Sequence, residues 1–155
     1  MKKYLLAIGI LLLVSCATQQ GSPELKMTGV SIPINQMNNE IKLSTTLGMM
    51  ETFKDTGVLE LNLDNLSDNP ITFSPDFGTK IFIQQGSNWT PIKNTFGYSD
   101  SGSVLPPKKD YALGTIVAVM PLLPSPSITS TIRIVVIGSL QGKDVGAYLD
   151  IDLSH

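Results

Sequence analysis

The chain has 155 residues, of which 42% are hydrophobic and 15% charged, and its formal net charge is -2. This length suits one compact domain, and the near balance of acidic and basic residues disfavours nucleic-acid binding. One cysteine, Cys16, and one histidine, His155, leave too few groups for zinc sites, disulfide frameworks or the usual Cys/His and Ser/His/Asp catalytic sites.

The first residues of the chain have the pattern of an export signal. Lys2 and Lys3 give a positive end, and Tyr4 begins an apolar run that continues to Val14. As a helix, this run would span only about 16 Å, whereas the hydrocarbon core of a bilayer is about 30 Å thick. The run therefore predicts a signal peptide rather than a membrane span.

The residues that end this signal, Leu13-Val14-Ser15-Cys16, resemble the lipobox of bacterial lipoproteins. The resemblance covers only the first sixteen residues. It implies cleavage between Ser15 and Cys16 and lipidation of Cys16 by a diacylglycerol and a further acyl chain such as palmitate. The alternative is an ordinary secretory signal with a chance cysteine, but the charge, length and motif order together favour the lipoprotein.

Lipidation implies a protein held at the cell envelope, because two or more acyl chains give durable anchoring. Ala17 stands where an Asp favours inner-membrane retention in enterobacterial lipoproteins, so in a diderm host we expect the outer membrane, on its periplasmic or surface face. The small and polar residues after Cys16 are typical of a flexible tether. We therefore expect a cleaved signal peptide (1–15), a lipidated Cys and tether (16–24) and one domain (25–155).

Period-two alternation dominates this domain and predicts half-buried strands. It is clearest where Leu59, Leu61 and Leu63 alternate with polar residues, which places these three leucines in the core. No segment predicts a helix. The strands are expected at 27–34, 41–47, 58–65, 70–74, 79–85, 111–120, 130–138 and 145–153. With turn residues between them, they predict an all-β fold: an immunoglobulin-like antiparallel β-sandwich of about seven to nine strands.

Three stretches, 61–73, 80–92 and Leu105-Pro106-Pro107, resemble bacterial immunoglobulin-like domains, and most of all the small secreted sandwiches that include the BsuPI-type proteinase-inhibitor fold. The likeness spans about residues 55 to 153 and implies the fold. The chain lacks a glycine after Pro107, where those domains often have one. We therefore carry over the fold and not the inhibitory activity.

Several acidic residues were considered as metal ligands. Asp150 and Asp152 share one face of the last strand and could bind a cation such as calcium if loop oxygens joined them. The favoured interpretation is the solvated face of an edge strand, where like charges discourage aggregation. Asp64, Asp68 and Asp100 are interpreted first as turn residues. No metal or other cofactor is predicted.

The candidates for binding a partner are aromatic and loop residues. Trp89, the only tryptophan, is interpreted first as a packing residue and second as an anchor for a partner or glycan. Tyr98, Asp100 and Tyr111 lie in or beside a long loop, 93–110, which is interpreted first as a mobile surface loop. It is also the most plausible recognition element, because binding residues concentrate on loops held by a rigid scaffold.

The leading functional hypothesis is a non-enzymatic, lipid-anchored envelope module that binds another protein or an envelope polymer through a sheet edge and a loop. The second is an inhibitor that presents the 93–110 loop to an exported protease. The third is an envelope enzyme that works with carboxylates alone, since His155 is terminal and Cys16 acylated.

Overall fold

The structure is a computed structural model, and it describes residues 27, 29–97, 100–111, 114–125 and 130–154. The predicted signal peptide, Cys16 and the predicted tether lie outside the described residues. Among the described residues, no helix is long and apolar enough to cross a membrane.

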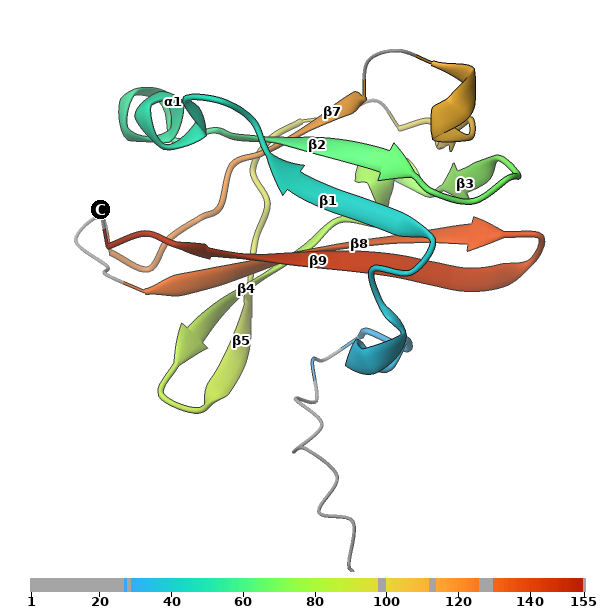
Figure 1. The fold of residues 1–155 in the computed structure, drawn as a ribbon. Coiled ribbons are helices and arrows are strands. Elements are labelled where there is room, and N and C mark those ends of the chain that lie inside the picture. The colour runs from blue at the N-terminus through green and yellow to red at the C-terminus, as the bar shows by residue number, and fades with distance from the viewer. Residues whose placement is uncertain (1–26, 28, 98–99, 112–113, 126–129, 155) are drawn as a thin grey trace, which may run out of the picture.

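Two antiparallel sheets make up the fold (Figure 1). The three-stranded sheet A has the order β1-β2-β7, and the larger sheet B has the order β5-β4-β8-β3-β6, with β9 on the other edge of β8. The strands of the described chain are β1 (Ile41–Thr45), β2 (Leu59–Asn65), β3 (Ile71–Phe73), β4 (Lys80–Gln85), β5 (Asn88–Ile92), β6 (Ser103–Leu105), β7 (Thr115–Val119), β8 (Thr131–Leu140) and β9 (Lys143–Asp152). This arrangement confirms the predicted all-β, immunoglobulin-like antiparallel sandwich.

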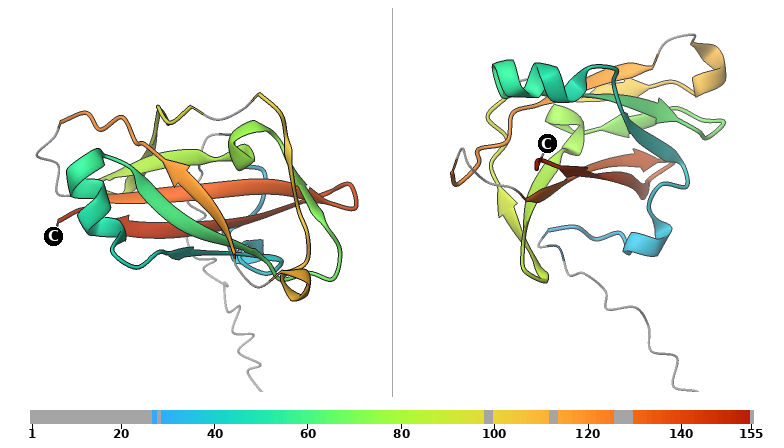
Figure 2. Two further views of the ribbon diagram at one scale, coloured as in Figure 1. Left: turned by 90° about the horizontal axis from the view of Figure 1, so that it is seen from above. Right: turned by 60° about the vertical axis from the view of Figure 1, so that its left-hand side comes forward.

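The main core lies between the two sheets. Leu59, Leu61 and Leu63 of β2 are fully buried there, as their alternation with polar residues predicts. Ile132 and Ile134 of β8 belong to the same apolar cluster from the side of sheet B. The right-hand view of Figure 2 shows the two sheets as stacked layers.

Sheet B is unusual because β3 and β4 share one edge of β8. Thr72 of β3 faces Ser139, and Lys80 of β4 faces Val135, while β9 pairs with β8 along its whole length. Between β3 and β4 lies a 3₁₀ turn, Pro75–Gly78, whose last three residues have positive φ angles. A Cβ atom on Gly78 would collide with a backbone carbonyl of β8, so this turn requires a glycine at its end.

One helix was not predicted. Helix α1 (Met49–Thr56) lies between two glycines, Gly48 and Gly57, that both have positive φ. Met49 is buried in the main core, and Met50 and Phe53 pack against it. The apolar positions 49, 50 and 53 share one helical face, and a pattern of only three residues is too short to predict a helix from the sequence.

The strand predicted at 27–34 is wrong. Residues 27 and 29–37, which we call the N-terminal strap, form an irregular segment with one 3₁₀ turn, Ile34–Gln36. The strap lies across the outer face of sheet B, where a backbone cannot join the hydrogen-bonded ladder. Pro33, which has no N–H, and Gly29, which has a φ of 77°, also interrupt an extended strand.

The strap is held by its apolar side chains, which form a second apolar cluster with sheet B. Met27 and Met37 are buried there with Phe82 of β4 and Val135 of β8. The partly buried side chains that pack against this cluster are Val30, Ile32, Ile34, Trp89, Ile137 and Tyr148. The chain after the strap then reaches the edge of β9, where Asn38 donates its backbone N–H to Gly146 O at 2.9 Å.

The described part of the expected 93–110 loop contains secondary structure that the sequence did not predict. It contains β6, which pairs with β3, and a 3₁₀ turn at Lys108–Asp110. At its start, Asn94 forms a bridge with Pro121, and Thr95 donates its backbone N–H to Met120 O at 2.8 Å. Strand β7 correspondingly begins at Thr115 rather than at residue 111.

Candidate interaction surface

The outer face of sheet B carries the only arginine of the chain, Arg133, and the hairpin of β8 and β9 determines its partner. Gln141 and Gly142, both with positive φ, form the two-residue turn of this hairpin. Such a turn fixes the register of the two strands. In this register Arg133 faces Asp150 directly.

Arg133 and Asp150 form a two-point ion pair. The guanidinium donates from Nε to Asp150 Oδ1 at 2.6 Å and from Nη2 to Oδ2 at 2.7 Å. The Arg133 side chain is 6% exposed and that of Asp150 is 39% exposed. This planar, two-point geometry is the strong form of a charged hydrogen bond, and it leaves the guanidinium little freedom to rotate.

Two aromatic rings enclose the same guanidinium. Its central carbon lies 4.3 Å from the centre of the Trp89 ring and 4.4 Å from that of the Tyr148 ring. A cation over an aromatic face contributes about 0.5 to 2 kcal/mol, and more where water is excluded. We call Trp89, Arg133, Tyr148 and Asp150 the Arg133 cluster. Within it, the single tryptophan is held in a fixed orientation.

Trp89 lies on β5, and the hairpin of β4 and β5 projects from the rest of the sandwich (Figure 1). Trp89 faces Gln84 across this hairpin, and the tip from Gln84 to Asn88 is exposed. Trp89 itself is half-buried, because one part of it packs on Arg133 and on the second apolar cluster. Trp89 therefore has the packing role that was its first interpretation, and its role as an anchor for a partner or glycan stays a prediction.

The pair Asp150 and Asp152 is not a simple solvated face, because Asp150 is bound to Arg133. Asp152 accepts a hydrogen bond from the backbone N–H of Ser154 at 2.9 Å. In the described part of the chain, no group of three acidic, histidine or cysteine side chains is placed to hold a metal ion. The carboxylate that sequence reasoning considered as a calcium ligand is thus the partner of an arginine.

Substitution of each carboxylate by an amide distinguishes the role of Asp150 from that of Asp152. Asp150→Asn is expected to lower the free energy of unfolding by about 1 to 3 kcal/mol, because it leaves the buried guanidinium without its ionised partner. Asp152→Asn is the matched control and should change it by less than about 0.5 kcal/mol. Urea denaturation of both variants provides the measurement. Equal effects would mean that the Arg133–Asp150 pair does not form in solution.

The other predicted partner-binding residues do not gather around Trp89. Tyr98 lies outside the described residues, and Asp100 is exposed. The hydroxyl oxygen of Tyr111 accepts a hydrogen bond from the backbone N–H of Asn65 at 3.2 Å, and its side chain packs against the main core. Tyr111 thus lies beside the end of β2 in sheet A, whereas Trp89 lies on sheet B.

The acidic turn residues of β2 have lysine partners. Asp64 is buried and pairs with Lys108 at 2.6 Å, whereas Asp68 is exposed and pairs with Lys109 at 2.7 Å. The hydrogen bond and the charge of Lys109 lower the pKa of Asp68 below its usual value, and Asp68 in turn raises the pKa of Lys109. Asp68 lies in the turn after β2, as predicted, whereas the prediction of a turn residue is wrong for Asp64, which lies within β2 opposite Lys42. The two ion pairs tie the 3₁₀ turn at Lys108–Asp110 to the end of β2.

Sequence reasoning missed Arg133, although a signal for it was present. It is the one charged residue in the apolar run 132–137, and such a residue in a buried strand needs a partner. If residues 141 and 142 form a two-residue turn, residue 140 faces residue 143, and the same register places Arg133 opposite Asp150. Tyr148 lies on the same hairpin, two residues before Asp150, but Trp89 could not be found in this way because it reaches the arginine from a different hairpin.

No protein-family model and no curated protein matches this chain. Among solved structures, it is similar to the archaellum periplasmic stator protein FlaG from Sulfolobus acidocaldarius, with 16% identity and a TM-score of 0.34, over 70% of this chain and 99% of that one. It is also similar to the stator protein complex of FlaF and FlaG from the same organism, with 18% identity and a TM-score of 0.36, over 79% of this chain and 100% of that one.

Proposed function

We propose that this chain is a lipid-anchored protein of the cell envelope that binds another protein or an envelope polymer and does not act as an enzyme. Two features support the proposal. The lipobox pattern that ends at Cys16 supports the anchor. The Arg133 cluster, which holds the only tryptophan at the surface of a projecting hairpin, supports the binding role.

The Arg133 cluster is the observation on which the binding role depends. A partner that packs on Trp89 meets a ring whose orientation is already fixed by Arg133 at 4.3 Å. Because little side-chain freedom remains to be lost, binding to such a ring costs less entropy than binding to a freely rotating one. Tryptophan is also among the residues that most often dominate the energy of protein interfaces.

The proposed anchor limits where the domain can act. Cys16 and Met27 are separated by 11 residue steps, and a fully extended chain spans at most about 3.6 Å per residue. Met27 therefore lies within about 40 Å of the lipidated residue. Met27, the first described residue, packs on the outer face of sheet B. A bound partner would be held close to the membrane.

The anchor is tested by a single substitution. Cys16→Ser is expected to abolish incorporation of a fatty-acid probe and to leave an unprocessed or unlipidated precursor, because the thiol is the attachment point that the lipobox implies. Labelled cells are analysed for probe in the wild type and the variant, with a serine substitution elsewhere in the tether, Thr18→Ser, as control. Equal label in wild type and Cys16→Ser would contradict lipid anchoring.

The binding role is tested on Trp89. A photo-crosslinking amino acid at the exposed position Gln85 captures the partner in intact envelopes, and Trp89→Ala is expected to lower the yield about tenfold, as for a dominant interface residue. The control is Val104→Ala, which removes an exposed apolar side chain from β6 at another edge of sheet B. Circular dichroism confirms that both variants are folded. Equal crosslinking in all three proteins would exclude the Trp89 surface.

A further inference from the structure

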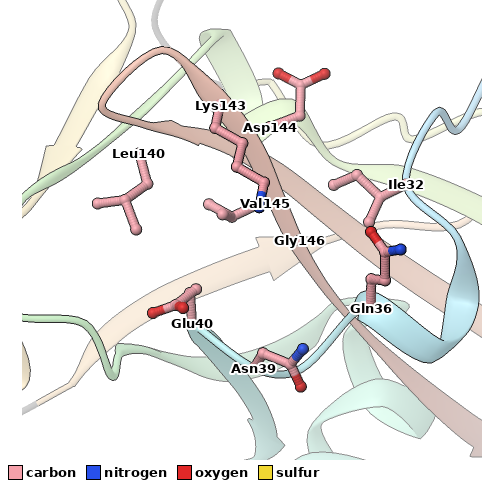
Figure 3. Close-up of a pocket in the computed structure, with 9 residues that line it drawn as sticks. All are labelled: Ile32, Gln36, Asn39, Glu40, Leu140, Lys143, Asp144, Val145 and Gly146. Carbon is pink, nitrogen blue, oxygen red and sulfur yellow. The ribbon is translucent and has the colours of Figure 1, made fainter.

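A pocket lies between the start of the domain and the tip of the β8–β9 hairpin (Figure 3). One wall comes from the strap and the residues that follow it, with Gln36, Asn39 and Glu40. The other wall is the hairpin, with Lys143. Its volume is about 310 Å³. This is at the lower end of the range for ligand sites, and it suits a molecule of the size of an amino acid or a dipeptide.

The polar side chains of this pocket have no partners of their own. Among the residues that the structure describes, the side chains of Gln36, Asn39, Glu40 and Lys143 form no hydrogen bond and no ion pair. Glu40 and Lys143 line the same pocket with opposite charges and yet do not pair with each other. Figure 3 shows the Lys143 ammonium directed into the space between Gln36 and Glu40.

A second carboxylate that lines the pocket, Asp144, already has a hydrogen-bond partner. Asp144 accepts a hydrogen bond from the Ser31 hydroxyl at 3.3 Å, and Figure 3 shows it pointing away from Glu40 and Asn39. The pocket is therefore lined by two carboxylates, one ammonium and two amides, beside apolar side chains such as Val145, and Glu40 is the carboxylate on the wall opposite Lys143. A ligand with a single charge would meet a like charge on one wall, whereas a zwitterion matches both.

We propose that this pocket binds a zwitterionic ligand of amino-acid or dipeptide size, with its ammonium on Glu40 and its carboxylate on Lys143. The amides of Gln36 and Asn39 can donate to the ligand carboxylate or accept from its ammonium. A second hollow of about 340 Å³ shares four lining residues with the pocket: Ile32, Gln36, Lys143 and Asp144. The pocket thus continues into a groove, which favours a short peptide over a single amino acid.

This proposal does not depend on lipid anchoring or on Trp89. It is tested by NMR titration of the full chain in detergent micelles with alanyl-alanine as the probe. We expect saturable shifts of the Asn39, Lys143 and Gly146 amides, with a dissociation constant in the millimolar range. N-acetyl-alanyl-alanine, which lacks the ammonium, and alanyl-alanine amide, which lacks the carboxylate, should each bind about threefold to fivefold more weakly, as expected for the loss of one solvent-exposed ion pair.

Two variants assign the charges. Glu40→Gln is expected to weaken binding of alanyl-alanine about threefold to fivefold and to leave that of the N-acetyl analogue unchanged. Lys143→Met is expected to weaken binding of alanyl-alanine about threefold to fivefold and to leave that of alanyl-alanine amide unchanged, because the amide lacks the carboxylate that Lys143 binds. Glu60→Gln and Lys42→Met, at exposed positions of sheet A, are the matched controls. Absence of saturable shifts at the pocket, equal affinity for all three peptides, or variants that bind like the controls would each overturn the proposal.

Discussion

Replacing Leu61 with alanine is expected to lower the free energy of unfolding by about 2 to 5 kcal/mol. Leu61 is fully buried at the middle of β2, where it faces Thr45 of β1 and Val117 of β7. The truncation removes apolar contacts and leaves a cavity that the two flanking strands cannot easily fill. Urea denaturation measures the change, provided that the slope of the transition is the same in both proteins.

The neighbouring residue on the same strand provides the control. Asn62 points away from the core and is only half-buried, so Asn62→Ala should change the free energy of unfolding by less than about 0.5 kcal/mol. A loss below about 0.5 kcal/mol for Leu61→Ala would mean that the register of β2 is wrong, because a shift by one residue exchanges the two faces of the strand.

Asn65→Ala is expected to cost about 2 to 4 kcal/mol, although it removes a polar residue. The Asn65 side chain is fully buried at the end of β2. Its Nδ2 donates to Asn69 O at 2.8 Å and to Leu105 O at 3.0 Å, and its Oδ1 accepts from the backbone N–H and the hydroxyl of Ser67. Alanine would remove the donor to the buried Leu105 carbonyl and the acceptor of the Ser67 backbone N–H, whereas the Asn69 carbonyl keeps its hydrogen bond from the Ser67 hydroxyl. The loss of hydrogen bonds at buried groups is expensive.

A milder change in the same network calibrates this result. Ser67→Ala removes only the hydroxyl and keeps the backbone N–H that binds Asn65, so we expect a loss of about 1 kcal/mol. Thermal or urea unfolding compares the two variants with the wild type. If Asn65→Ala were no more harmful than Ser67→Ala, water would be replacing the side chain, and the turn after β2 would be less tightly packed than its contacts indicate.

The parts of the fold that could be predicted are those in which one face of a strand is apolar and the other polar. The alternation around Leu61 places β2 correctly, and the apolar run around Ile134 marks the central strand β8. The strap has a similar alternation, at Val30, Ile32 and Ile34, but these side chains pack on the face of a sheet rather than pairing at its edge. Alternation reports which side chains are buried and not whether the backbone is paired.

The candidate site was harder to predict because it is built from two hairpins. Trp89 was identified for its residue type alone, and nothing near it in the sequence indicates that Arg133 lies beneath its ring. The 93–110 segment was taken for a recognition loop because it is polar and rich in glycine, proline and serine. A pairing of only three residues, β6 with β3, orders its middle, and so short a strand is hard to detect from one sequence.

The way in which the strap is attached has a mechanical consequence. Under the proposed anchoring, a load between the membrane and a bound partner enters the domain at Met27. The strap is attached there by apolar side chains, and its backbone hydrogen bonds lie within the strap itself. Under a pulling force, apolar contacts of this kind break one residue at a time. The strands that follow Asn38 in the chain are paired, and several hydrogen bonds share the force between them. The strap therefore yields first, lengthens the tether and uncovers Phe82 and Val135, while the sandwich core stays folded.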